Sequence, residues 1–202
     1  MTKIVVDATS SPGRFTDFQP TFAHILSLGI ELGWSLSNQS SLELYNVSTL
    51  YPSDRLSSLH YRISYAFAVA DLQSLISLVE KLPPITEASN SWERFVSGLA
   101  DYRYYLLSGE KAKLSAAITL FESISIDTSV VSSDGVADKP RLFDARVRLQ
   151  LANAYLTLGE STFAQEKQVS LEQANTIWNA MNYPALIIDH PALWGAHRHL
   201  YF

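Results

Sequence analysis

The chain contains no cysteine, and this absence removes several classes of site from consideration. Disulfide bridges, thiolate-bound metals and cysteine nucleophiles are excluded outright. Charged residues are also scarce, at 17%, against about 25% in a typical globular protein. Because a folded protein usually keeps its free surface charged, we expect part of this surface to be covered by a partner or by a second copy of the chain.

No segment has the properties of a membrane span, a signal peptide or a nucleic-acid-binding patch. The most apolar stretch, residues 22–34, is too short to cross a bilayer and contains His24 and Glu31. The N-terminus has neither a long apolar core nor a small-residue cleavage site. The densest basic stretch, around Arg146, is interrupted by Asp144, and the net charge is −5. We therefore expect a cytoplasmic protein that binds neither membranes nor nucleic acids.

Helical periodicity begins at Pro20, where apolar residues recur three and four positions apart. The expected apolar face of this first helix comprises Phe22, Ile25, Gly29, Leu32 and Leu36. A capping-box pattern at residues 40–43 predicts a short second helix that ends near Tyr51. Ahead of these helices, residues 1–19 are expected to form an N-terminal arm, in which Ile4–Val6 is either one short strand or extended chain.

The rest of the chain, up to residue 182, predicts three helix pairs at about 56–82, 91–124 and 141–182. Their internal turns are expected at Ala70-Asp71, Gly109-Glu110 and Gly159-Glu160. A second capping-box pattern, Asn90 to Glu93, precedes the second pair. The helix that begins near residue 141 carries two apolar stripes, so it should have neighbours on two sides, as stacked helix pairs require.

At these turns the sequence resembles the tetratricopeptide repeat. The family pattern Tyr-x-x-x-Gly is matched by 105–109 and 155–159, and the pattern Ala-x-x-x-Phe by 117–121 and, with Trp, by 174–178. The turns lie farther apart than the roughly 34 residues of that family, so the repeats are irregular. The resemblance implies an all-α fold, a short solenoid of stacked antiparallel helix pairs, within a single helical domain at 20–202.

No phosphate-binding loop, nucleophile elbow or zinc-helix motif occurs, so we expect neither an enzyme nor a cofactor. The first hypothesis is a non-catalytic scaffold that binds a protein or peptide along the inner face of the helix array. The residues expected to contact that partner are Arg94, Asp101, Tyr102, Arg146 and Asn153.

Two alternatives rest on the C-terminal tail, residues 185–202. The tail is too apolar for a free end, and it either caps the last helix pair or docks into a partner through Trp194, Tyr201 and Phe202. The docking case predicts an obligate accessory subunit of an enzyme complex.

A third hypothesis is a metal-dependent protein. Three tail histidines, His190, His197 and His199, are candidate metal ligands. Packing and hydrogen bonding in the tail is the simpler role for them, and His24 and His60 are expected to be core or interface histidines.

Overall fold

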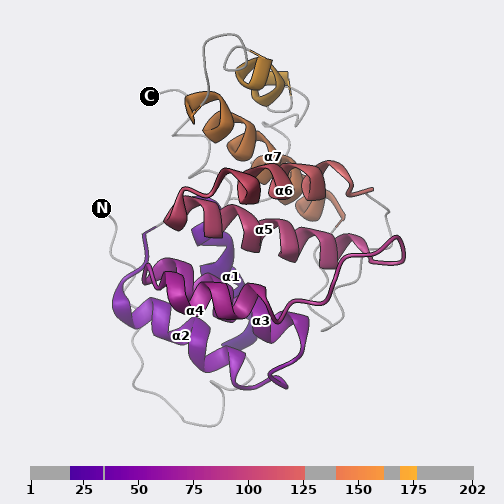
Figure 1. Cartoon of the computed structure of the whole chain (residues 1–202). Helices are drawn as coiled ribbons and strands as arrows, with labels where there is room; N and C mark the ends of the chain where they lie inside the picture. Colours follow the sequence, from indigo (N-terminus) through magenta and orange to yellow (C-terminus); the bar gives the residue numbers. More distant parts are fainter. Residues whose placement is uncertain (1–18, 34, 126–139, 162–168, 177–202) are drawn as a thin grey trace.

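The computed structural model describes residues 19–33, 35–125, 140–161 and 169–176 (Figure 1). All regular structure in these ranges is helical, which confirms the expected all-α class. The strand or arm expected ahead of residue 19 lies outside them. The helices are α1 (Gln19–Glu31), α2 (Asn38–Ser48), α3 (Leu56–Ala68), α4 (Leu72–Val79), α5 (Ser91–Ser108), α6 (Lys111–Glu122) and α7 (Pro140–Ser161). A further helical stretch covers 169–176.

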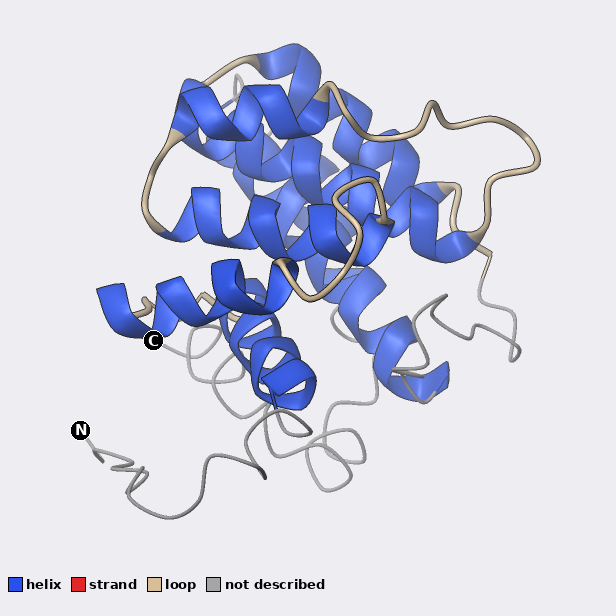
Figure 2. Cartoon of the chain, turned by 90° about the horizontal axis from the view of Figure 1, so that it is seen from below, coloured by secondary structure: helices blue, strands red, loops and turns tan. Residues whose placement is uncertain are grey.

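Each helix packs against the next one along the chain, from α1 to α7. The odd-numbered helices also pack in a row, α1 on α3, α3 on α5 and α5 on α7. Short turns join α3 to α4 (69–71) and α5 to α6 (109–110), and Figure 2 shows the described chain as helices connected by loops. None of the helices in the described ranges is long and apolar enough to cross a membrane.

Local sequence signals account for the start and end of several helices. Asn90 Oδ1 accepts a hydrogen bond from the Glu93 amide at 2.9 Å, and Glu93 Oε2 accepts one from the Asn90 amide at 2.8 Å, so the predicted capping box is confirmed. The turn between α5 and α6 lies at Gly109, whose φ of 74° is a left-handed value that glycine adopts at little cost. The α3–α4 turn uses Ala70 at φ 55°, after which Asp71 caps α4.

Three local predictions were wrong. Helix α2 is capped by Ser37 and not by Ser40, because the Ser37 hydroxyl accepts the Ser40 amide. Helix α7 continues through Gly159 to Ser161, so the turn expected at Gly159-Glu160 is absent.

The third error concerns the orientation of α1. Its buried face carries Ala23, Leu26 and Ile30, whereas Ile25, which was expected to be buried, is 46% exposed. The cause is that polar side chains occupy part of the buried face of α1, so counting apolar residues alone gives the wrong face.

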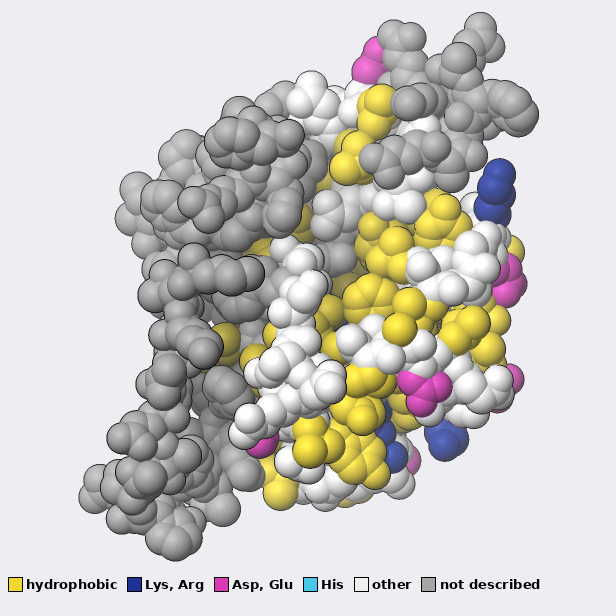
Figure 3. Space-filling view, turned by 90° about the vertical axis from the view of Figure 1, so that its left-hand side faces the viewer, with side chains coloured by type: hydrophobic (Ala, Val, Ile, Leu, Met, Phe, Trp, Pro, Cys, Tyr) yellow, Lys and Arg dark blue, Asp and Glu magenta, His cyan; other side chains and the backbone are white. Residues whose placement is uncertain are grey.

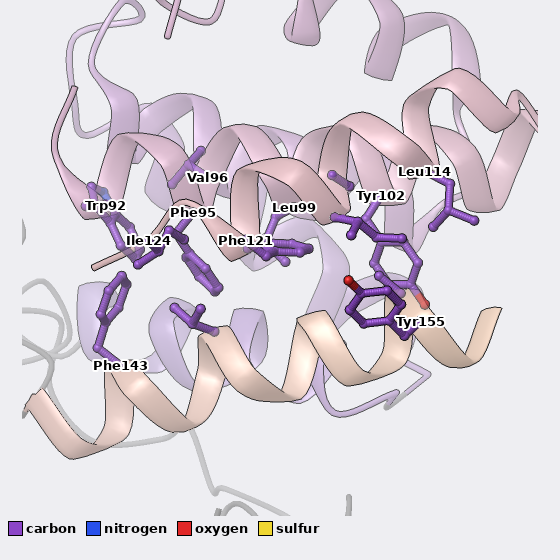
Figure 4. Close-up of a cluster of buried hydrophobic side chains, with 14 of the residues drawn as sticks. Trp92, Phe95, Val96, Leu99, Tyr102, Leu114, Phe121, Ile124, Phe143 and Tyr155 are labelled. Atoms are coloured by element: carbon purple, nitrogen blue, oxygen red, sulfur yellow. The ribbon is translucent and has the colours of Figure 1, made fainter. Parts of the chain in front are cut away.

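Three apolar clusters are formed entirely by described residues. The largest joins α5, α6 and α7 and contains a chain of aromatic rings in tilted and edge-on contact, in which Phe95 lies 6.1 Å from Phe121 and 5.4 Å from Phe143 between ring centroids (Figure 4). A second cluster joins α3, α4 and α5. The third is confined to α1, α2, α3 and the segments beside them.

Both apolar stripes that the sequence predicts on α7 contain buried residues. Phe143, Val147 and Ala154 face the largest cluster, and Ala145, Leu149 and Ala152 are buried as well. This helix therefore has packing on two sides, as its sequence predicted.

Candidate functional site

Two of the five residues expected on a partner-binding face make contacts within the chain. Arg94 donates hydrogen bonds to the carbonyls of Thr86 (2.8 Å) and Ser89 (3.1 Å), which fixes the loop ahead of α5. Asp101 pairs with Lys113 of α6 at 2.9 Å in a partly exposed ion pair. Both side chains therefore support the α5–α6 unit, and their assignment to a partner stays a prediction.

The other three lie on or near the surfaces between α5 and α7. Tyr102 is 8% exposed, and its hydroxyl lies 2.9 Å from the Thr157 hydroxyl. Asn153 is half-buried. Arg146 is fully enclosed, with 1% exposure. In this arrangement Arg146 can contact a partner only after it is uncovered.

The tail residues lie outside the described ranges. This holds for the docking residues Trp194, Tyr201 and Phe202 and for the candidate metal ligands His190, His197 and His199. Among the described residues, no group of three or more His, Asp or Glu side chains could hold a metal ion.

A buried ion pair joins the first and last labelled helices. Arg146 of α7 binds Glu31 of α1 through two parallel bonds, Nε to Oε2 at 2.9 Å and Nη2 to Oε1 at 2.8 Å, with each side chain 1% exposed. Gln150, one turn farther along α7, donates to the Glu31 carbonyl at 3.0 Å. The guanidinium carbon of Arg146 lies 5.3 Å from the Trp92 ring centroid and 4.9 Å from that of Phe95. This two-bond geometry is the strongest that an arginine makes with a carboxylate.

The Glu31–Arg146 ion pair connects the two ends of the row of odd-numbered helices. Helix α1 contacts α3, α3 contacts α5 and α5 contacts α7, and the ion pair joins α7 to α1. The four helices thus surround a polar interior, which we call the polar cluster. Its members are Ser27, Glu31, His60, Ser64, Arg103, Arg146 and Gln150.

Hydrogen-bond accounting fixes the proton positions within this cluster. Ser64 donates its only hydroxyl proton to the His60 carbonyl at 2.8 Å, and its oxygen accepts from Arg103 Nη1 at 2.9 Å. Ser27, 3.1 Å from the Ser64 oxygen, must therefore donate to it. The Ser27 oxygen then accepts from His60 Nε2 at 2.9 Å. His60 therefore carries a proton on Nε2, and its lowered pKa favours the neutral ring, in which Nδ1 is unprotonated.

Two nitrogens of the cluster have no hydrogen-bond partner among the described residues. They are His60 Nδ1, which is the unprotonated ring nitrogen, and Arg103 Nη2. Arg103 is 3% exposed and also stacks over Phe67, with its guanidinium carbon 5.7 Å from the ring centroid. An incompletely paired buried guanidinium is costly, because a charge removed from water needs compensating bonds.

Burial lowers the pKa values of two groups in the polar cluster, His60 and Arg103. Burial holds the pKa of His60 well below its ordinary value of 6.5, and the positive charges of Arg103 and Arg146 and the neighbouring His24 lower it further. Burial lowers the pKa of Arg103 from 12.5 to about 10, with Glu31 opposing and Arg146 adding to this shift. Arg103 therefore stays charged at neutral pH. Among the described residues, the buried charged side chains are two arginines and one glutamate.

The sequence pattern indicated Arg146 and predicted a core or interface position for His60, which is 2% exposed, but it did not indicate the other members of the cluster. Its members repeat at four-residue spacing on three helices, as Ser27 with Glu31, His60 with Ser64, and Arg146 with Gln150. Four-residue spacing places both members of each pair on one helix face. Polar pairs aligned with an apolar stripe were therefore the available signal.

No protein-family model, no curated protein and no solved structure matches this chain. The polar cluster holds helices together and contains no accessible nucleophile, and its chemistry is that of paired charges and hydrogen bonds.

Proposed function

We propose that this chain is a non-catalytic helical scaffold that binds a protein or peptide partner. The observation that carries the proposal is an exposed apolar surface on α2 and α3, formed by Leu42, Tyr45, Tyr65 and Val69, which we call the α2–α3 surface. Leu42, Tyr45 and Val69 are 47%, 44% and 39% exposed.

These four side chains are contiguous. Leu42 and Tyr45 lie three positions apart on α2, and Tyr65 and Val69 four positions apart, at the end of α3, so each pair shares a helix face. The Tyr45 and Tyr65 rings join the two pairs, with centroids 5.5 Å apart. Figure 3, which views the side on which α2 lies, shows hydrophobic side chains over much of the described surface with few charged groups between them.

Exposed aromatic and aliphatic groups without interspersed charge are typical of protein–protein contacts. Tyrosine is especially favourable, because it offers a large apolar ring and a hydroxyl that stays hydrated before binding. The low charge of the whole chain and its resemblance to tetratricopeptide repeats support the same class of function. Four of the five inner-face residues named from sequence are enclosed or bonded within the chain, and for this reason we propose the α2–α3 surface as the partner contact.

A quantitative capture experiment tests this proposal. The full chain is compared with the double variant Leu42→Glu/Val69→Glu and with the matched control Leu106→Glu/Leu156→Glu, which changes two leucines of similar exposure on α5 and α7. Proteins from the native lysate are quantified after capture on each bait, and circular dichroism checks that all three are folded. We expect partners lost from the first variant and retained by the control. Equal retention on all three baits contradicts the proposal.

A further inference from the structure

We propose that the partner of the α2–α3 surface is an amphipathic helix with an acidic side chain that binds Arg62, about two helical turns from the end of the surface formed by Leu42 and Val69. This inference rests on the proposed function, because it names the chemistry of the partner that binds the same surface. Three features of the described residues carry it, which are the position of Arg62, the bonding of its guanidinium and the charges around it.

Arg62 lies at one end of the α2–α3 surface. On α3 it precedes Tyr65 by three positions and Val69 by seven, so the three residues share one helix face. Its Nε donates a hydrogen bond to the Ser48 hydroxyl at 3.3 Å, and Ser48 follows Tyr45 by three positions on α2. Two successive contacts between α2 and α3 are therefore the pair of tyrosine rings and the guanidinium, which borders the apolar surface.

The guanidinium of Arg62 has unused capacity for hydrogen bonds. Its one bond within the described part of the chain is the contact with Ser48, whose 3.3 Å exceeds the usual N–H···O range of about 2.7–3.2 Å. Arg146 and Arg148, by contrast, already bind carboxylates of this chain at 2.8 Å and 2.6 Å. Because Arg62 is half-buried, a bond to an incoming carboxylate forms in a partly desolvated place, where it is stronger than at a free surface.

The charges on α2 and α3 favour an acidic group at this end of the surface. Helix α3 contains no acidic residue, and α2 contains one, Glu43. Glu43 lies two positions before Tyr45, so its side chain is on another face of α2. No carboxylate within the described ranges forms an ion pair with Arg62. An acidic partner therefore complements the charge that borders the α2–α3 surface.

The surface also favours a helical partner over an extended one. An extended peptide gains much of its affinity by pairing its backbone with an exposed sheet edge, and the residues that the structure describes form no sheet. Val69 and Arg62 are seven positions apart on α3, about 10.5 Å along the helix axis. A partner helix covers the same distance with an apolar residue and an acidic residue seven positions apart. A second apolar residue, four positions from the first, then packs on the tyrosine rings.

Selection from a displayed library of helical peptides tests this inference. The library is built on an alanine-rich helix of about 18 residues, long enough to be helical alone. The positions of one helix face are randomised among apolar, acidic, basic and neutral polar residues. The baits are the full natural chain, Arg62→Glu, the surface variant Leu42→Glu/Val69→Glu and the control Arg148→Glu, which changes an exposed arginine of α7. Circular dichroism checks that every bait is folded, and sequencing gives the enrichment at each position.

We expect the natural chain and Arg148→Glu to enrich peptides with two apolar residues and, seven positions from the first, Asp or Glu. Arg62→Glu should instead enrich Lys or Arg at that position, because the favoured partner charge is reversed. The dominant peptide and its neutral amide form are then titrated against the natural chain and Arg62→Gln by fluorescence anisotropy. Loss of either charge should weaken binding about three- to tenfold, and loss of both should add little further.

This inference and the proposed function fail in different ways. Apolar peptides that show no preference at the acidic position, and that the variant Leu42→Glu/Val69→Glu does not bind, overturn the role of Arg62 and leave the surface as a partner contact. Peptides that bind this variant as well as the natural chain contradict both. If no peptide is enriched, the helical partner is overturned, while the capture experiment still tests the surface. A dimer in sedimentation equilibrium that the same variant dissociates assigns the surface to a second copy and also overturns the inference.

Discussion

The α5–α6–α7 core and the polar cluster enclosed by α1, α3, α5 and α7 are both buried, but they are held by different forces. The core is built from packed aromatic rings and aliphatic side chains, whose stabilisation grows with the apolar area removed from water. The cluster is built from charges and hydroxyl groups that contribute only while each has its partner. The two regions should therefore respond differently to cavities, to overpacking and to changes in pH.

The largest expected effect is the loss of a core ring. Phe95 is 0% exposed and lies at the centre of the aromatic chain, so Phe95→Ala should lower the free energy of unfolding by about 3–5 kcal/mol. Urea unfolding followed by circular dichroism measures the change. Leu106→Ala, at a site on the same helix that is 45% exposed, is the matched control and should cost well under half as much. Similar losses in both variants would show that the aromatic chain does not dominate core stability.

The next effect concerns the close approach of α5 and α6. A methyl group at Gly98 would lie 2.6 Å from Phe121 Cε1, which is below any normal contact distance. We expect Gly98→Ala to destabilise the core by about 1–3 kcal/mol through overpacking, despite the better helix propensity of alanine. Gly98→Ala/Phe121→Leu should recover part of the loss in the same urea titration, because the smaller side chain makes room. A stabilised Gly98→Ala variant would mean that the helices separate at no cost.

The pH dependence should reside in the polar cluster. The folded-state pKa of His60 is lowered, so the unfolded chain binds more protons once the pH falls below the ordinary value of 6.5. Stability present above this pH is therefore lost as the pH falls toward the lowered pKa, at up to about 1.4 kcal/mol per pH unit. Urea titrations across this window should show a smaller slope for His60→Gln, which does not titrate, than for the natural chain. Parallel curves for the two proteins would assign the acid sensitivity to other groups.

The smallest expected effect is at the start of α5. Asn90→Ala removes the cap while leaving the core intact, and it should cost about 1 kcal/mol. The matched variant Ser37→Ala removes the cap of α2, which lies outside the α5–α6–α7 core. The melting temperatures of both variants compare the contribution of the cap of α5 with that of the cap of α2. An unchanged melting temperature for Asn90→Ala would show that the reciprocal Asn90–Glu93 bonds contribute little.

Local signals in the sequence predicted much of the fold, because helix periodicity and end signals depend on neighbouring residues. The capping box at Asn90 and the turn at Gly109 are examples. Gly159 shows the limit of this reasoning, since a glycine permits a turn without requiring one, and packing extends α7 past it. The polar cluster was harder to predict, because Glu31 and Arg146 are far apart in the sequence. A single sequence contains no information that pairs them.

Native-state hydrogen exchange across a urea series tests most directly whether the region held by the polar cluster is less stable than the apolar α5–α6–α7 core. If it is, amides of α1 exchange through an opening of lower free energy than amides of α5, and this free energy falls further in acid. The α5 amides then exchange only with global unfolding, at both pH values. A single opening free energy shared by α1 and α5 at every pH would contradict the account, because the two regions would then be one cooperative unit.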